Sequence, residues 1–452
     1  MARAAASSLL RLTAYGLPGL PLAALLLPLY VYLPTFYAAD LGLGFAAVAA
    51  VLTATRIWDV LTDPLIGSLS DRTRSRFGRR RPWMLAGAPL LLVSAYFLFL
   101  PAPGASLPYL LLWVAILTLG GTMVLLPYSA WGAELTVDYH GRSRVSAARE
   151  VFVVVGTILA AGLPAAFGED RGRALEMLFW ILLVSLPIAL TLALTLVPEP
   201  TPRSTAALPW RRSLGLLRSN GPFRRLILAY FLNGIANGLP ATLFLLFAEF
   251  GLDAKASSGA FLLTYFLCGI LSVPLWLRLT RPFDKHRVWI GAMLLACAVF
   301  VCVPLLGPGD GAWFFLVCVL TGLALGADLV LPPSMQADVI DLDRLRSGRE
   351  RAGLYFALWG MGTKLALALA VGIAFPLLEF AGFEDKPGGG GALPLLVLAG
   401  LYSLLPVAFK LGAIALMRGY PITAARHQRL RERIVLRQAS RPGVPAYKLH
   451  DL

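Results

Sequence analysis

Long apolar runs separated by short polar segments fill the chain from residue 13 to residue 417. A helix needs about 20 apolar residues, at about 1.5 Å of rise each, to cross the hydrocarbon core of a bilayer. The pattern therefore predicts an all-helical membrane protein with twelve transmembrane helices. The predicted spans are residues 13–38, 44–69, 83–101, 107–133, 149–168, 175–197, 224–249, 257–279, 287–306, 312–335, 353–380 and 392–417.

Composition supports this prediction. Hydrophobic residues make up 58% of the 452 residues and charged residues only 14%, whereas a soluble domain carries about 25% charged residues. The net charge of +15 would suit nucleic acid, but the basic residues are spread over short segments between apolar runs. We therefore expect the lipid bilayer as the partner and exclude nucleic acid.

Basic side chains collect on alternate loops. The segments after predicted spans 2, 4, 6, 8 and 10 hold most of them, whereas residues 101–106 and 307–311 contain none. Because cytoplasmic loops are enriched in Lys and Arg, we predict that both termini are cytoplasmic and that the chain lies in the cytoplasmic (inner) membrane.

The two halves of the chain resemble each other. Pro64-Leu65 at the second span recurs as Pro274-Leu275 at the eighth, and the end of the fourth span, Pro127-Tyr128-Ser129, recurs as Pro332-Pro333-Ser334 at the tenth. Parallel repeats of this kind build the 6+6 major facilitator fold. The predicted domains are a six-helix bundle over 1–198, a cytoplasmic linker over 199–222, a second bundle over 223–417 and a basic cytoplasmic tail over 418–452.

Two acidic residues lie within the second span. Asp59 and Asp63 are four residues apart and share one helix face. Each carboxylate near the bilayer centre costs about 2.5–3.5 kcal/mol, and two together repel. Arg56, a bound cation or a shared proton would relieve that cost. The alternative is a structural ion-pair cluster at the cytoplasmic end of the helix, where Asp71 lies.

The second span begins a long motif that continues into the next loop. It reads Arg56-Ile57-Trp58-Asp59, Asp63-Pro64-Leu65-Ile66-Gly67 and Arg72-Thr73-Arg74-Ser75-Arg76-Phe77-Gly78-Arg79-Arg80-Arg81-Pro82-Trp83. Two further segments, Pro127-Tyr128-Ser129-Ala130 and Ala337-Asp338-Val339-Ile340-Asp341, accompany it. Together they resemble the glycoside–pentoside–hexuronide:cation symporters, the melibiose permease family of the major facilitators.

This resemblance implies a transporter that works by alternating access and moves a small solute of the sugar or glycoside type with Na⁺ or H⁺. It implies that Asp59, Asp63 and Thr122 bind the coupling cation, and that Arg149 and Lys364 lie near the sugar and cation sites. We expect a monomer with no cofactor and no metal beyond a possible sodium ion.

The first and fourth spans depart from the family's sugar porters. The stretch from Gly16 to Pro21 has no charged residue where those porters carry a polar pair, and Leu125 stands where they carry an acid. Recognition of a polyol requires a partner for each buried polar group. The alternative substrate is therefore an amphiphile such as a lysolipid.

The second half contains further polar residues within predicted spans. Asn233 and Asn237 lie four apart in span 7, and Asp328 lies in span 10. Gly234, Gly238 and Pro240 interrupt the helix around the two asparagines, and such a broken stretch could expose backbone carbonyls to a cavity. An intramembrane acid such as Asp328 indicates function by default. We therefore predict that all three contact substrate; the alternatives are helix packing with asparagine cross-links and a structural Asp–Lys bridge. Lys364 is the expected partner of Asp328, whereas Lys410 is expected to extend to the membrane interface.

The Arg-rich loop after span 2 is predicted to close the cytoplasmic side. Arg74 and Arg76 are the candidate gating cations, and Asp71, Glu134 and Asp138 are the candidate acids. The chain shows no nucleophile–base pair and no metal cluster at the interface, so we expect no enzyme. A non-transporting membrane sensor is the other class considered, and it would carry an added soluble domain.

Overall fold

The computed structural model describes residues 2–27, 33–136, 139–167, 171–198, 220–347, 351–383, 391–426 and 428. Every regular element in these ranges is helical. Prolines inside the spans, such as Pro64 and Pro240, do not end their helices, because membrane helices can satisfy the freed backbone groups through neighbours. Seven of the predicted spans are each one α-helix. In chain order, spans 3, 4, 6, 8, 9, 10 and 11 correspond to α5 (Arg81–Phe99), α6 (Leu107–Leu135), α8 (Arg171–Leu196), α11 (Ser258–Leu279), α12 (Lys285–Cys302), α13 (Gly311–Ser347) and α14 (Ala352–Phe380).

The remaining spans are less regular or more highly charged. Span 7 is α10 (Gly221–Leu246) with a π-helical turn, and span 12 combines α15 (Ala392–Ala399), a π-helical turn and α16 (Leu405–Met417). Spans 2 and 5 are α4 (Phe45–Arg72) and α7 (Tyr139–Phe167). Helix α4 carries charges from Arg56 to Arg72, and α7 carries its charges in its first half. Span 1 is divided into α1 (Ala2–Gly16), α2 (Gly19–Leu27), α3 (Leu33–Thr35) and the π-helical turn Phe36–Asp40.

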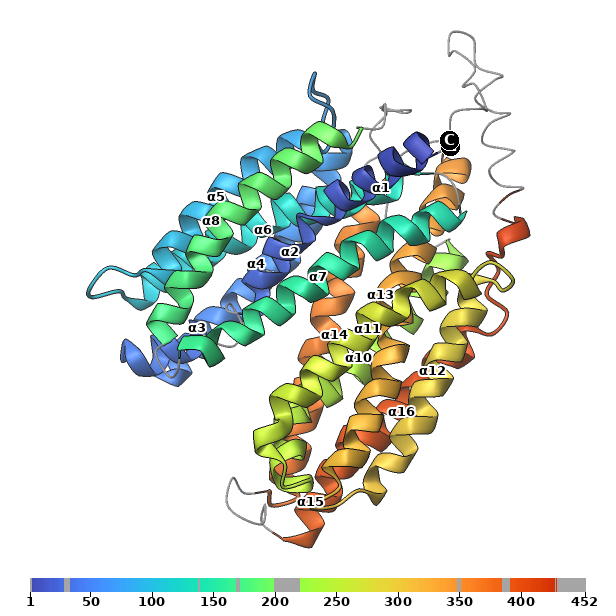
Figure 1. Cartoon of the computed structure of the whole chain (residues 1–452). Coiled ribbons are helices and arrows are strands. Elements are labelled where there is room, and N and C mark those ends of the chain that lie inside the picture. Colours follow the sequence, from blue (N-terminus) through green and yellow to red (C-terminus); the bar gives the residue numbers. More distant parts are fainter. Residues whose placement is uncertain are drawn as a thin grey trace.

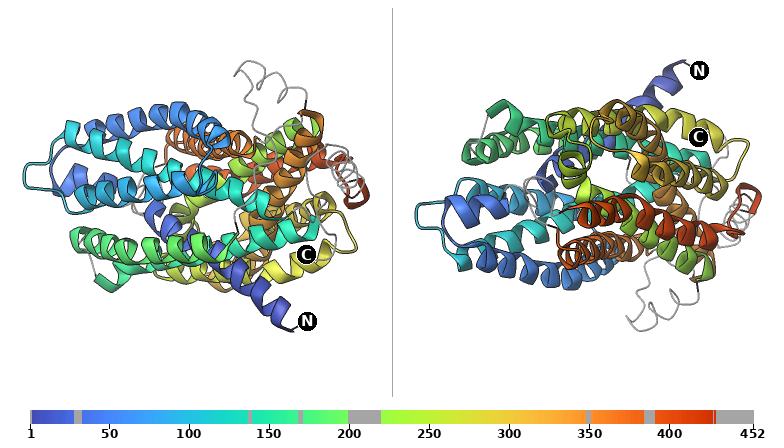
Figure 2. Two further views of the ribbon diagram at one scale, coloured as in Figure 1. Left: turned by 90° about the horizontal axis from the view of Figure 1, so that it is seen from above. Right: turned by 90° about the horizontal axis from the view of Figure 1, so that it is seen from below.

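The helices form two bundles (Figure 1). The N-terminal bundle contains α1 to α8 and the C-terminal bundle α10 to α16; each is built around its own apolar core. Seen from above and from below, the blue helices of the N-terminal bundle lie mainly on the left and the red part of the C-terminal bundle lies on the right (Figure 2). Residues 199–219 of the predicted linker and most of the basic tail lie outside the described residues.

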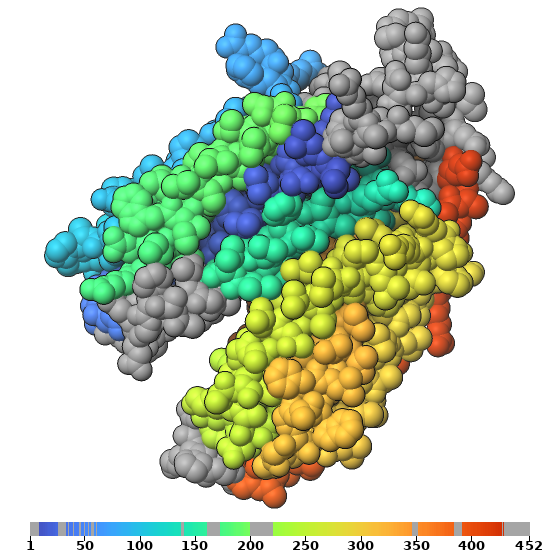
Figure 3. Space-filling model, viewed as in Figure 1, coloured from blue at the N-terminus to red at the C-terminus, as the bar shows by residue number. Residues whose placement is uncertain are grey.

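The bundles meet at one end of the molecule, which we call the terminal end because α1 begins and α16 ends there (Figure 1). Helix α4 packs on α14, and α7 packs on α11 and α13. Toward the opposite end the bundles diverge, and a wedge-shaped gap separates them (Figure 3). The structure is therefore closed at the terminal end and open at the opposite end.

Two glycines set how closely α4 and α14 approach. A Cβ atom added to Gly353 would lie 2.5 Å from the carbonyl oxygen of Gly67, and one added to Gly67 would lie 2.6 Å from the carbonyl oxygen of Gly353. The two backbones are thus in direct contact at the terminal end, which only residues without a side chain allow.

Candidate functional site

The acid pair of α4 lies against a lysine of the other bundle. Asp59 and Asp63 are each 2% exposed. Lys364 Nζ of α14 lies 3.0 Å from Asp59 Oδ2 and 2.8 Å from Asp63 Oδ2, and Thr122 Oγ1 of α6 donates to Asp63 Oδ1 at 2.8 Å. These four residues, which we call the acid site, come from three helices and both bundles.

The acid site has a net negative charge. Two carboxylates and one ammonium group sum to −1, and Asp59 Oδ1 is buried without a hydrogen-bond partner. An unsatisfied buried oxygen costs about 1–3 kcal/mol, and more when it is charged. One monovalent cation at Asp59 Oδ1 would neutralise the net charge of −1 and give this oxygen a partner. Oxygen ligands suit a hard cation, and a proton would bind the same atom.

The alternative interpretation, a structural cluster at the helix end, does not fit this geometry. Asp71 lies eight residues beyond Asp63, about 12 Å along the helix at 1.5 Å per residue. Its own partners are Arg80 and the backbone of α14. The side chain of Arg56 lies outside the described residues.

Two predicted partners in the C-terminal half were wrong. Lys364 does not pair with Asp328, because α14 directs it across the bundle interface to the acid site. Lys410 does not reach the interface; it is 2% exposed and lies 3.5 Å from Asp328 Oδ2. Lys410 also donates to Asn233 and Asn237. That Asn233, Asn237 and Asp328 contact substrate stays a prediction.

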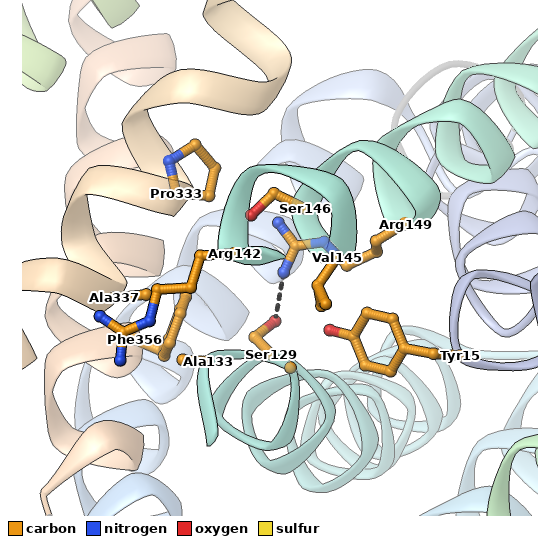
Figure 4. Close-up of a pocket in the computed structure, with 11 residues that line it drawn as sticks. Tyr15, Ser129, Ala133, Arg142, Val145, Ser146, Arg149, Pro333, Ala337 and Phe356 are labelled. Carbon is orange, nitrogen blue, oxygen red and sulfur yellow. Dashed lines mark hydrogen bonds between the residues drawn. The ribbon is translucent and has the colours of Figure 1, made fainter. Parts of the chain in front are cut away.

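Arg149 occupies a narrow cavity between the bundles (Figure 4). It forms an ion pair with Glu150 of the same helix, and its Nη1 donates to Ser129 Oγ at 3.1 Å. The Tyr15 hydroxyl points into the same space (Figure 4). The cavity has space for roughly one water molecule.

Sequence reasoning missed an aromatic pair near these groups. Tyr230 of α10 stacks on Trp359 of α14 with ring centroids 3.8 Å apart, and the hydroxyls of Tyr230 and Thr363 are 2.8 Å apart. Thr363 immediately precedes Lys364. The polar and aromatic residues around Lys364 in an apolar span were the signal that could have identified this surface.

Charged residues join the bundles at the terminal end. The Asp71 carboxylate accepts the backbone N–H groups of Gly353 and Leu354 at 2.9 and 3.1 Å, at the positive end of the α14 dipole. Arg80 Nη2 lies 2.6 Å from both Asp71 Oδ1 and Glu134 Oε1. Arg79 also pairs with Glu134, at 2.7 Å.

Two of the candidate gating acids, Asp71 and Glu134, thus contact arginines that were not among the candidate gating cations, and that Arg74 and Arg76 act in gating stays a prediction. Arg79 and Arg80 are the cations bound to Asp71 and Glu134, whereas Arg74 and Arg76 lie exposed on the loop, with Arg76 over the Phe77 ring. Gly78, at φ 100°, turns the chain between the two groups of arginines. Asp138 lies outside the described residues.

A second cross-bundle contact is formed by Arg142 of α7. Its guanidinium lies 3.1 Å from Asp338 Oδ1 and 2.5 Å from Asp341 Oδ2 of α13. Lys285 pairs with the other oxygen of Asp338 at 2.7 Å. The Arg142 side chain is 2% exposed, so water screens these charges only weakly.

Replacing Arg142 by Lys is expected to loosen the terminal end. A lysine presents one point charge instead of a planar fork that reaches two acids, and losing one charged hydrogen bond costs about 1.5–3 kcal/mol. A cysteine at position 334 (Ser334→Cys) reports opening of the terminal end, because Ser334 is buried against Ser143 of the other bundle. We expect faster maleimide labelling of the purified protein. Arg144→Lys, at an exposed position of the same helix, is the control, and equal labelling in both variants would contradict the prediction.

Comparisons with known proteins place this geometry in context. A family model described as MFS/sugar transport protein matches residues 14–424. An uncharacterised symporter of Synechocystis sp. is 28% identical, covering 91% of this chain and 93% of its own. The human sodium-dependent lysophosphatidylcholine symporter 1 is 25% identical over 85% of this chain and 78% of its own. A putative glycoside/cation symporter of Escherichia coli, YagG, is 24% identical over 90% of each chain.

Solved structures agree on the fold. The transporter FucP of the major facilitator superfamily, in its outward conformation, superposes with a TM-score of 0.65 at 14% identity, covering 92% of this chain and 99% of that chain. This similarity, together with the family model, confirms the prediction of a major facilitator fold. Within the described residues, nine helices are long and apolar enough to cross a membrane.

Proposed function

Since the chain belongs to the family of MFS/sugar transport proteins, we propose that it is a secondary transporter that couples solute movement to a monovalent cation. The observation that carries this proposal is the acid site. Its net charge of −1, the unpartnered Asp59 Oδ1 and the lysine from the opposite bundle form a site that a cation would complete.

Coupling follows from the position of Lys364. The lysine compensates the acids only while α4 and α14 stay together, and separating the bundles removes it. A carboxylate left without compensation at the bilayer centre costs about 2.5–3.5 kcal/mol. A bound Na⁺ or H⁺ replaces part of the lost compensation, so it lowers the cost of opening the terminal end. The cation therefore shifts the equilibrium through its differential affinity for the two states.

We place the terminal end in the cytoplasm, because the loops there carry most of the basic residues. In that orientation the described state is open to the outside, and the contacts of Asp71, Arg80 and Arg142 close the inner side. Thr122 holds Asp63, and Arg149 lines the solute path toward the closed end.

The substrate class follows from the charges around Arg149. Arg149 and Glu150 form a pair of zero net charge, and their side chains are 14% and 12% exposed. A solute with both a positive and a negative group can form ion pairs with Glu150 and Arg149 at the same time. An anion alone would pair with Arg149 and leave the charge of Glu150 uncompensated. Tyr15 and Ser129 are the neutral polar side chains lining the described cavity besides Ser146, and they are few for a polyol. This observation favours a zwitterionic amphiphile, such as a lysophosphatidylcholine, over the sugar or glycoside that the family description suggests.

A thermal-stability screen of the purified protein tests both parts of the proposal. Melting temperatures are compared with and without Na⁺, at two pH values, in the presence of lysophosphatidylcholine, lysophosphatidic acid or melibiose. We expect a cation-dependent rise in Tm and a further rise with lysophosphatidylcholine. Glu150→Gln should reduce the preference for lysophosphatidylcholine over lysophosphatidic acid, because it removes the partner of the ammonium group. If Tm does not change with Na⁺ or with pH, cation coupling is rejected. If melibiose alone raises Tm, the substrate is a sugar and not a zwitterionic amphiphile.

A further inference from the structure

Lys410 and Asp328 form a further buried charge pair in the C-terminal bundle, which the proposed coupling does not use. The ammonium group of Lys410 faces three side-chain oxygens: Asn233 Oδ1 at 2.7 Å, Asn237 Oδ1 at 2.8 Å and Asp328 Oδ2 at 3.5 Å. Three oxygens match the three donors of an ammonium group, and oxygen is also the ligand atom that a hard cation takes. Here the cation is part of the chain.

The acid of this cluster is also fully engaged. Trp289 Nε1 donates to Asp328 Oδ1 at 2.6 Å, and Asn237 Nδ2 donates to Asp328 Oδ2 at 3.0 Å. Lys410 and Asp328 sum to zero charge. The cluster therefore differs from the acid site, where the sum is −1 and Asp59 Oδ1 has no partner.

The two lysines also differ in how they respond to movement of the bundles. Lys364 reaches from the C-terminal bundle to acids of the N-terminal bundle, so rocking of the bundles breaks its contacts. Lys410 and its partners all belong to α10, α12, α13 and α16, and these helices lie in one bundle. Rigid-body rocking leaves the cluster around Lys410 unchanged.

We infer that Lys410 is a permanent tethered cation, which fills an ion site in the C-terminal bundle, keeps Asp328 compensated in every state and leaves the transporter a single exchangeable cation site. Only the clause about exchangeable sites rests on the proposed coupling. The tethered-cation site itself rests on the contacts of Lys410 and is tested separately.

A double-mutant cycle tests charge compensation. Asp328→Asn and Lys410→Met each leave one buried charge without its partner, so each is expected to lower Tm by several degrees. The double variant removes both charges and should recover most of that loss. If the decrease in Tm of the double variant equals the sum of the two single decreases, or if the double variant fails to fold, Lys410 does not simply compensate the charge of Asp328. The inference is then wrong.

The same variants test the number of exchangeable sites. The rise in Tm that Na⁺ or acid produces in the wild-type protein should persist in the double variant and vanish in Asp63→Asn. Loss of the cation response in the double variant would place an exchangeable ion at Asp328 and overturn the inference. If the wild-type protein shows no cation response, the proposed coupling fails, while the Tm pattern of the cycle still decides whether Lys410 compensates Asp328.

Chemical rescue tests whether the three oxygens around Lys410 bind a cation when the ammonium group is removed. Lys410→Ala leaves the three oxygens in place and removes the ammonium group. With Asp63→Asn added to silence the acid site, methylammonium should raise the Tm of this variant. It should not raise the Tm of Asp63→Asn alone, where Lys410 still fills the site. Equal responses to methylammonium in the two proteins would contradict a vacated cation site.

Discussion

Replacing Asp63 by Asn is expected to abolish uptake driven by a cation gradient, while exchange of solute between two pools at equal concentration persists at a reduced rate. In the variant Lys364 and Asp59 sum to zero charge, so the acid site no longer attracts a positive ion. Thr122 can still donate to the amide oxygen, which keeps the local packing. The loss of one full charge from a buried ion site corresponds to a decrease of about 10²-fold or more in cation affinity, since each 1.4 kcal/mol is tenfold.

Uptake into proteoliposomes with an imposed Na⁺ or H⁺ gradient measures gradient-driven transport. Counterflow without a gradient measures solute exchange. Asp63→Glu is the matched control, because it keeps the charge and moves it by one methylene group. We expect that control to retain part of the gradient-driven uptake. Full gradient-driven uptake by Asp63→Asn would show that the coupling cation binds elsewhere.

The helix count and the location of the acid site were predictable from sequence for the same reason. Lipid forces every span to be a long apolar run, so charges inside a run, such as those of Asp59 and Asp63, are conspicuous. Thr122 could be placed beside them only through the family motif, because periodicity within α4 does not specify which face of α6 it meets.

The partners of the lysines could not be predicted, because they depend on packing between distant helices. Lys364 and Asp63 are 301 residues apart in sequence, and only the approach of α14 to α4 joins them. Lys410 lies near the end of its apolar run, which is typical of a side chain that extends to the interface. The rotation of α16 about its axis instead directs it into the bundle, and the sequence contains no measure of that rotation.

The loop arginines illustrate a different limit. Six arginines lie between residues 72 and 81, and no periodicity distinguishes them, because the segment is not a continuous helix. The turn at Gly78 decides that Arg79 and Arg80 point back toward Glu134 and Asp71. The charge of the loop was therefore predictable, whereas the identity of the arginines that contact Asp71 and Glu134 was not.

Replacing Gly353 by Ala is expected to prevent the terminal end from closing as it does here, and so to reduce transport by about tenfold or more, the factor that 1.4 kcal/mol of bias produces. The added Cβ would lie 2.5 Å from the Gly67 carbonyl oxygen and 2.9 Å from Asp71 Oδ1. The first of these atoms is backbone and cannot rotate away. The helices must therefore separate, which also pulls the α14 N–H groups from the Asp71 carboxylate.

Gly372→Ala on the same helix is the matched control, because a Cβ there meets nothing within 4 Å. Alanine also has a helix propensity about 1 kcal/mol better than glycine, so the control should be at least as stable as the wild-type protein. We expect Gly353→Ala, but not Gly372→Ala, to speed maleimide labelling of Ser334→Cys. If both variants label and transport alike, the glycine contact does not determine closure. If Gly353→Ala alone opens the terminal end, the close approach of Gly67 and Gly353 brings Lys364 within reach of the acid site, and closure and charge compensation are one event.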